Sequence, residues 1–407
     1  MTDRPTAIGI GMVGAGTMAA AHSAALTLLD PLYPALAHRP HLAAAADVNE
    51  TLAARLKDRF GYDRVDTDWR RVVEAPDVDL VVACLPPVLN HEVVLAAAAA
   101  GKAIVCEKPL AESAPAAMEL LDACRAASVF HGLGAAYRWT PALRAIRALI
   151  ERGELGEIRS VQAAFMLDYA ADPEVPLLWR FRRSLAGGGI AIDTGYHVVD
   201  SVRFLVGEID AVQGLTMTAI HERSLPAAGA IGNRGAITDG AATERGPVDV
   251  EDAAAAIVSF AGGAYGVLET SRVAVGRRVS LKIDVFGSIG SAGWDFERPD
   301  EFAVCLPGDP GTFGYRRVLV NPTHPGAAEL LIGGTDGTGI GWLGQGCAMW
   351  AEFFSAITEG RRARADFEDG VRTNAVIDAL YASAASGLRT PVAQPAGLDP
   401  ALHGVMP

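Results

Sequence analysis

Cysteine is scarce in this chain, and the pattern of its cysteines excludes two kinds of protein. The five cysteines are odd in number, scattered and without a CxxC pair. Disulfide scaffolds and zinc sites need paired or closely spaced cysteines. We therefore expect no metal, and free thiols in a reducing cytoplasm, at Cys84, Cys106, Cys124, Cys305 and Cys347.

Basic stretches and long apolar runs are also missing. The net charge is −13 and no basic segment is present to neutralise phosphates, so we expect no nucleic-acid partner. No apolar run approaches the ~20 residues that a membrane helix needs. The chain starts MTDRPT, which lacks the basic and apolar regions of a signal peptide. We expect a cytoplasmic protein with no membrane partner.

The chain does have the length and the apolar content for two hydrophobic cores. Of its 407 residues, 50% are hydrophobic and 20% are charged, which is ordinary globular composition. The pattern of elements changes near residue 135, and no internal repeat is visible. We predict a nucleotide-binding domain over 1–134 and a domain for substrate binding and oligomerisation over 135–407.

In the first segment, short apolar strands alternate with helices. This rhythm predicts an α/β domain with a doubly wound parallel sheet, which binds ligands at the carboxyl ends of its strands. The strand over 78–85 is almost continuously apolar, as expected where both faces of a parallel sheet are covered. The other strands are expected over 7–13, 42–48 and 103–106, and helices over 19–29, 91–100 and 116–127.

The second segment has longer strands that alternate polar and apolar residues between glycine-rich turns. It predicts an α+β domain with a large, mostly antiparallel sheet. Strands are expected over 158–168, 253–260, 266–273 and 280–286, and late helices over 349–359 and 370–386. Two glycine-rich stretches, at about 222–250 and 307–346, are expected to be excursions on the surface or at an interface.

A glycine loop between the first strand and the first helix predicts dinucleotide binding. A Gly-x-Gly-x-x-Ala motif alone is weak, since glycines also serve ordinary turns, but this one has the strand and helix that the fingerprint requires. The first glycine allows a tight turn, and the second lets a pyrophosphate approach the N–H donors of the helix. The candidate cofactor residues here are Gly14, Gly16, Thr17 and Met18.

Asp47 ends the second strand, where a carboxylate can accept both ribose hydroxyls of the adenosine. It lies about ten residues further from the loop than is usual, which fits an insertion around 31–40. Its alternative role is that of a helix cap or a turn residue. Because Glu50 follows, and no nearby arginine or lysine does, we expect NAD rather than NADP.

Three further residues offer acid–base chemistry. Lys108 precedes a proline, which keeps it out of a helix and at the carboxyl end of a strand. Asp193 and His197 are four apart, so on one helix they would share a face, with Asp193 near its positive end. Alternatively, Lys108 is an ordinary surface lysine, and His197 is a core histidine whose hydrogen bonds are met within the protein. Trp179 and Arg180 are candidates for lining the ligand pocket, and the alternative is a core aromatic beside a surface arginine.

Together these motifs resemble the Gfo/Idh/MocA oxidoreductases, the family of glucose–fructose oxidoreductase and inositol 2-dehydrogenase. The resemblance runs over 13–16, 85–91, 106–110, 137–141, 179–180, 187–197 and 365–370. One departure is Pro86-Pro87, where many relatives have Thr-Pro. The resemblance implies a Rossmann domain, an open-faced C-terminal domain whose sheet often builds dimers or tetramers, and NAD(P) chemistry on sugars or polyols.

The resemblance also implies roles for single residues. Lys108, Asp193 and His197 would form the catalytic group and, with Tyr137, meet the substrate. Cofactor contacts would come from Leu85, Pro86, Asn90, His91, Glu107, Lys108, Trp179 and Arg180.

We therefore expect NAD-dependent oxidation of a secondary hydroxyl on a cyclic polyol or sugar of the inositol, anhydrosugar or glucoside type. His197 would take the proton, Asp193 would hold the imidazole, and Lys108 would stabilise the developing alkoxide. We expect a homodimer or homotetramer built through about 158–290. Two alternatives stay open: an NAD-dependent glycoside hydrolase or lyase that oxidises its sugar transiently, and a non-catalytic sensor of NAD and sugar.

Overall fold

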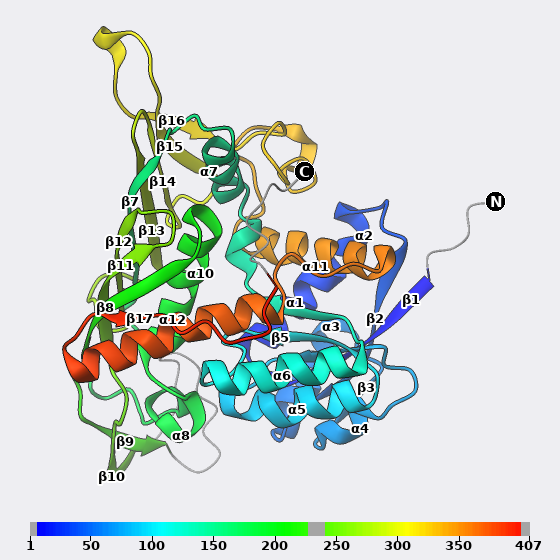
Figure 1. Cartoon of the computed structure of the whole chain (residues 1–407). Helices are drawn as coiled ribbons and strands as arrows, with labels where there is room; N and C mark the ends of the chain where they lie inside the picture. Colours follow the sequence, from blue (N-terminus) through cyan, green and yellow to red (C-terminus); the bar gives the residue numbers. More distant parts are fainter. Residues whose placement is uncertain (1–5, 227–240, 400–407) are drawn as a thin grey trace. The chain divides into compact units, whose positions relative to one another are not determined.

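The computed structural model describes residues 6–226 and 241–399, which divide into two compact units. The first unit contains residues 6–111, 115–139 and 340–371, and the second contains the remaining described residues. Figure 1 labels their helices and strands. The division of roles at residue 134 stays a prediction, and the first unit also takes in a segment from late in the chain.

A six-stranded parallel sheet forms the centre of the first unit. Its strands are β1 (Thr6–Val13), β2 (His38–Ala46), β3 (Arg64–Asp66), β4 (Leu80–Ala83), β5 (Ala103–Glu107) and β6 (His131–Gly134). They are ordered β3-β2-β1-β4-β5-β6, which confirms the predicted doubly wound sheet. Because the order reverses beside β1 and β4, the carboxyl ends of these strands frame the place where such sheets bind ligands.

The helices of the first unit alternate with these strands. α5 starts at Pro87 rather than at residue 91, because proline is well suited to the first helical position. The set is α1 (Thr17–Thr27), α2 (Leu29–Leu32), α3 (Glu50–Phe60), α4 (Trp69–Val73), α5 (Pro87–Ala99), α6 (Ala114–Ala127) and the 3-10 helix η1 (Ala136–Trp139).

One late helix, α11 (Trp342–Glu359), completes the first unit. The indole N–H of Trp350 donates to Nδ1 of His22 on α1 at 3.0 Å. Phe353 lies over Gly132 of β6, where an added Cβ would come within 3.0 Å of the ring. These contacts explain why residues 340–371 belong with the parallel sheet.

The second unit is built on a nine-stranded sheet, coloured green to yellow for most of its strands in Figure 1. Its strands are β7 (Ile158–Met166), β8 (Ile209–Met217), β11 (Ala253–Phe260), β12 (Tyr265–Ser271), β13 (Ser280–Gly287), β14 (Ser291–Asp295), β15 (Glu301–Cys305), β16 (Arg316–Leu319) and β17 (Thr390–Pro391). They are ordered β16-β15-β14-β13-β7-β12-β11-β8-β17. β7 and β12 pair in parallel and the other neighbours pair antiparallel, so the predicted mostly antiparallel sheet is confirmed.

The helices of the second unit range from single turns to the 20-residue α12. α10 packs against β7 and β12 of the large sheet. The set is α7 (Pro141–Glu151), η2 (Trp179–Phe181), α8 (Arg183–Ala186), α9 (Ile190–Asp193), α10 (Gly195–Val206), η3 (Pro310–Thr312), η4 (Ile332–Gly334) and α12 (Phe367–Ser386), whose first turns belong to the first unit.

The two glycine-rich stretches contain more regular structure than we expected. Within 222–250, β9 (Glu222–Pro226) pairs with β10 (Ala241–Pro247) as an antiparallel ribbon, and 227–240 lie outside the described residues. Within 307–346, β16 extends the large sheet and α11 already begins. Gly346 concealed this helix start, but an added Cβ there would lie 3.3 Å from Ala25, so the glycine serves close packing.

Asp366 caps α12, which therefore begins at Phe367 rather than at residue 370. Its Oδ1 accepts the N–H of Glu368 at 2.9 Å, and its Oδ2 accepts Nη2 of Arg362 at 2.7 Å. Burial, with the nearby Asp369 carboxylate, raises the pKa of Asp366 to about 6 from an ordinary 3.8. Because the folded pKa lies above the unfolded one, its contribution to stability is present at low pH and is lost as the pH rises through about 6.

We predict that Asp366→Asn gains stability relative to the wild type as the pH rises from about 4 to about 7, because the amide cannot ionise in this buried position. Asp366→Ala should be less stable than Asp366→Asn by about 1 kcal/mol at each pH, since it lacks the cap acceptor. Urea unfolding of the three proteins across this pH range measures both differences. A gap between the wild type and the Asn variant that does not change with pH would contradict the raised pKa.

Candidate active site

The glycine loop after β1 has the geometry of a phosphate cradle. Gly14 has a φ of +97°, and an added Cβ would lie 2.5 Å from the carbonyl oxygen of Cys84, so only glycine fits there. Gly16 is the N-cap of α1 and supplies no side-chain acceptor, and a Cβ added to it meets no atom within 4 Å. The start of α1 therefore offers N–H groups beside open space, which fits a pyrophosphate.

Asp47 follows β2 directly and reaches the same loop. Its Oδ2 accepts the N–H of Ala15 at 2.7 Å, and its Oδ1 accepts the N–H of Asn49 at 2.8 Å. The turn role that the sequence left open is thus present. A carboxylate has about four acceptor positions, so these two bonds leave room for the predicted ribose contact.

Four of the predicted cofactor residues follow β4, two in the loop and two on α5, and they occupy different surroundings. Leu85 and Pro86 are half-buried. Asn90 is buried and its Oδ1 accepts the N–H of Leu85 at 3.3 Å, so this side chain shapes the loop. His91 has its Nε2 2.9 Å from the Glu119 carboxylate, on the more exposed side of α5.

Glu107 is held in a buried network that the sequence did not reveal. Its Oε1 lies 2.9 Å from Nε2 of His22, whose Nδ1 accepts the indole N–H of Trp350. Because an indole nitrogen can only donate, the proton of the neutral imidazole is on Nε2 and points at Glu107. Burial and the Glu107 carboxylate raise the pKa of Cys84 well above its ordinary value, so this thiol stays protonated. Lys108 follows Glu107 and is half-buried.

Tyr137 lies on η1, and its neighbour fixes that short helix. Arg138 is buried and pairs with the Asp369 carboxylate at 2.9 Å, at the start of α12. This pair therefore brings two of the motifs into direct contact within the first unit. Tyr137 is itself buried.

The predicted single helix for Asp193 and His197 is a pair of helices. Asp193 is the last residue of α9, Thr194 separates the two helices, and His197 lies in the first turn of α10. The Thr194 hydroxyl lies 2.8 Å from the hydroxyl of Thr270 on β12, which ties this junction to the large sheet. The expectation of one continuous helix was wrong, because the chain is interrupted at Thr194, where this side-chain hydrogen bond holds it against the sheet. The ring of His197 packs near Phe165 of β7, with centroids 5.9 Å apart.

Asp193 is paired with an arginine. Nε of Arg180 lies 3.4 Å from Oδ2 of Asp193, and both side chains are about 15% exposed or less. The guanidinium of Arg180 also stacks on Trp179, with Cζ 4.2 Å from the ring. The second unit thus presents a carboxylate whose charge is balanced by a cation, in the residue pair that the sequence marked for pocket lining and catalysis.

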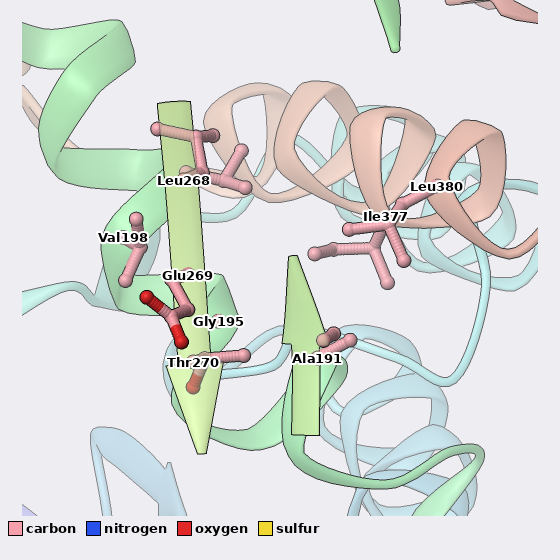
Figure 2. Close-up of a pocket in the computed structure, with 10 residues that line it drawn as sticks. Ala191, Gly195, Val198, Leu268, Glu269, Thr270, Ile377 and Leu380 are labelled. Atoms are coloured by element: carbon pink, nitrogen blue, oxygen red, sulfur yellow. The ribbon is translucent and has the colours of Figure 1, made fainter. Parts of the chain in front are cut away.

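A small apolar cavity lies behind this helix pair, as Figure 2 shows. Its volume is about 20 Å³, room for about one water molecule and too little for a sugar ring. Its walls come from α9, α10, β11, β12 and α12, at Ala191, Gly195, Val198, Val199, Ala254, Leu268, Glu269, Thr270, Ile377 and Leu380. It is a packing gap and not the substrate site.

In residues 6–226 and 241–399, no group of three or more His, Cys, Asp or Glu side chains is arranged to hold a metal ion. No helix in this part of the chain is long and apolar enough to cross a membrane.

Comparison with known proteins identifies the family of this chain. A model of the oxidoreductase family with an NAD-binding Rossmann fold matches residues 8–134, and a model of the GFO/IDH/MocA C-terminal domain matches residues 143–293. The chain belongs to the Gfo/Idh/MocA family. It is 36% identical to levoglucosan dehydrogenase of Pseudarthrobacter phenanthrenivorans over 379 residues, which cover 93% of this chain and 96% of that protein. It is an NAD-binding oxidoreductase.

Two further relatives agree with this placement. Myo-inositol 2-dehydrogenase of Thermotoga maritima is 27% identical over 308 residues, covering 75% of this chain and 80% of that protein. The solved structure of levoglucosan dehydrogenase in complex with NADH and levoglucosan has a TM-score of 0.89 at 34% identity, and the match covers 96% of this chain and all of that one. The fold predicted from the Gfo/Idh/MocA motifs is confirmed.

The two loop glycines of this Gfo/Idh/MocA protein should respond differently to a methyl group. Gly14→Ala should lose at least about 1 kcal/mol of stability, because its positive φ and the Cys84 carbonyl both oppose a Cβ. Gly16→Ala should fold normally and bind NAD about tenfold or more weakly, because its Cβ would project where the pyrophosphate approaches. Thermal melting and NADH titration of both variants separate the two effects. Normal NADH affinity in Gly16→Ala would contradict this loop as the pyrophosphate site.

Proposed function

We propose that this protein oxidises a secondary hydroxyl of a cyclic sugar or polyol to the ketone, with an anhydrosugar of the levoglucosan type as the first substrate to test and an inositol as the second. The observation that carries the proposal is the Arg180–Asp193 pair directly ahead of the helix that bears His197. The name of the relative that is 36% identical supports the substrate class.

The roles of the chain's own residues follow from their chemistry. His197 takes the hydroxyl proton of the substrate, and Asp193 stabilises the imidazolium that results. Lys108 donates a hydrogen bond to the reacting oxygen as negative charge develops on it. Arg180 balances the Asp193 charge and offers its remaining N–H groups to ring hydroxyls, while Tyr137 adds a phenol. NAD, when bound, accepts the hydride at C4 of its nicotinamide.

The two domains would divide this work. Residues 1–134 would bind NAD through the glycine loop, Asp47 and the loops after β4 and β5. Residues 135–407 would bind the substrate and assemble the oligomer. We also propose a cytoplasmic location for the enzyme, since its substrate and cofactor are soluble metabolites.

One face of the large sheet supports the proposed assembly. Along most of β11 and β12 and the second half of β8, more exposed side chains alternate with more buried ones. Ile257 lies opposite Val267 in the β11–β12 register, and both are exposed. A group of exposed apolar side chains on neighbouring strands is typical of an association surface. Its members are Leu215, Met217, Ile257, Tyr265 and Val267.

The catalytic assignment predicts which variants lose turnover. With the true substrate, His197→Ala and Lys108→Ala should each lower kcat by about 10²- to 10⁴-fold, because each removes a group that moves or stabilises charge in the transition state. His41→Ala and Lys57→Ala are matched controls on the surface of the first unit and should keep wild-type kcat. The measurement is the appearance of NADH with levoglucosan, myo-inositol and other cyclic polyols.

The same assay decides between dehydrogenase and the two alternatives. A dehydrogenase accumulates NADH in proportion to ketone. Cleavage of a glycoside without net NADH would instead indicate a hydrolase or lyase that recycles its cofactor. Binding of NAD with no turnover on the whole panel would favour a sensor, and near-wild-type kcat in His197→Ala would place the proton acceptor elsewhere.

The apolar face predicts the oligomeric state. We expect a dimer or tetramer at micromolar concentration, and Ile257→Asp should dissociate it, because a carboxylate would be buried without a partner. Val275→Asp is the matched control, since Val275 is exposed but lies outside the three strands. Sedimentation velocity measures the mass. A wild-type species of 42.5 kDa would refute the assembly.

A further inference from the structure

The short helix that ends in Asp193 is held by one buried glutamate. Glu251 accepts the N–H of Gly189 with both carboxylate oxygens, at 3.1 Å each, and the N–H of Ala191 with Oε1 at 2.9 Å. Its main-chain oxygen accepts the N–H between these two, from Ile190, at 3.1 Å. One residue therefore satisfies the consecutive donors at the start of α9.

These hydrogen bonds to Glu251, which we call the clamp, matter because α9 has a single turn. Helices this short do not form on their own, since nucleation fixes several residues for one hydrogen bond. The hydroxyl of Tyr381 also donates to Oε1 of Glu251 at 2.8 Å. Burial and the Glu251 carboxylate raise the pKa of Tyr381 well above its ordinary value, so the phenol keeps its proton and its donor role. An added Cβ on Gly189 would lie 2.2 Å from the Glu251 carbonyl oxygen, so the clamp needs glycine there.

The next residue, Asp252, supports the other member of the Arg180–Asp193 pair. Asp252 is fully buried and its Oδ1 accepts Nε of Arg272 at 2.7 Å. Nη1 of Arg272 in turn donates to the main-chain oxygen of Arg180 at 2.9 Å. Asp252 is fixed by two backbone donors, the N–H groups at 219 and 220, at 2.9 and 3.0 Å.

The segment that carries Arg180 is fixed further by its following residue. Phe181 is fully buried between two guanidiniums, with Cζ of Arg272 at 4.4 Å and Cζ of Arg223 at 4.2 Å from its ring centroid. Arg223 donates to the main-chain oxygens of residues 170, 172 and 175. Cation–π contacts are strongest where both partners are desolvated, as here.

We propose that Glu251 and Asp252 are the positioning residues of the catalytic carboxylate, Glu251 by clamping the helix that ends in Asp193 and Asp252 by fixing, through Arg272, the backbone of its partner Arg180. This inference rests on the proposed catalytic role of Asp193. Neither acid touches the substrate in it. Each acts by fixing the positions of Asp193 and Arg180. A shift of about 1 Å in such a group can lower the rate on the order of a hundredfold.

The first test changes the clamp without changing its size. In Glu251→Gln the side chain can no longer accept hydrogen bonds at both positions, because one carboxylate oxygen is replaced by an NH₂ group that faces N–H donors. It should lower kcat by about ten- to a hundredfold while the KM for NAD stays within about twofold. Glu352→Gln is the matched control, a glutamate of the first unit whose side chain is 8% exposed and accepts Nη1 of Arg361 and a backbone N–H from residue 364. It should keep wild-type kcat.

Two more variants keep the test informative if Glu251→Gln folds poorly. Tyr381→Phe removes one donor to Glu251 and should lower kcat by about two- to tenfold. Arg272→Lys cannot bridge Asp252 and the Arg180 carbonyl together, and it should show the same loss in kcat with normal NAD affinity. Circular dichroism and NADH titration on the same preparations report the folded fraction. Wild-type kcat per folded enzyme in all three variants would overturn the proposal.

A double-mutant cycle separates this inference from the proposed function. If Glu251 acts through Asp193, then Glu251→Gln should change kcat by less than about twofold in an Asp193→Asn background. An equal loss in both backgrounds would overturn the positioning role. Wild-type kcat in Asp193→Asn alone would overturn the proposed function instead, and a large loss in Asp193→Asn with none in Glu251→Gln would overturn only the inference.

Discussion

Backbone N–H groups at helix starts must find acceptors, and this constraint shapes the candidate residues of each unit. Ahead of Asp193, the protein supplies the acceptor itself, since Glu251 occupies the first donors of α9. At the start of α1, Gly16 supplies none, and the space beside it is open. One helix start is thus closed by a carboxylate of the chain, and the other has the open space that the proposed pyrophosphate site needs.

Buried and well-bonded groups also lie next to the candidate charged side chains of each unit. The fully buried groups of the second unit, Asp252, Arg272, Phe181 and Arg223, surround the segment of Arg180 and leave its side chain and Asp193 partly exposed. In the first unit, the buried chain Trp350–His22–Glu107 ends one residue before Lys108. In both units a fixed and desolvated layer lies directly behind a partly buried charged group, which is the arrangement that keeps such a group oriented without a reorganisation cost.

The features that could be predicted from the sequence are those with a local signature. The alternation of apolar strands and helices predicted the parallel sheet, and the glycine spacing predicted the loop at 14–19. The split between α9 and α10 could not be predicted, because it depends on the hydroxyl of Thr270, which lies 76 residues from Thr194. Glu251 and Asp252 were missed for the same reason: two acids before an apolar strand look like a solvated turn, and only the fold shows the donors that meet them. The start of helix α11 was predicted too far along the sequence, because its glycines are typical of loops until their packing partners are known.

The membership of α11 in the first unit has a consequence for biosynthesis. Trp350 reaches His22 across a separation of 328 residues, so the ribosome must release almost the whole chain before the parallel sheet acquires its last helix. Until then, the pocket for that indole and the ring of Phe353 stays uncovered on the nascent domain. The second unit is synthesised in between, so completion of the nucleotide-binding unit is one of the final folding events. Before that point, the exposed apolar surface of the nascent first unit must be protected by chaperones at the ribosome.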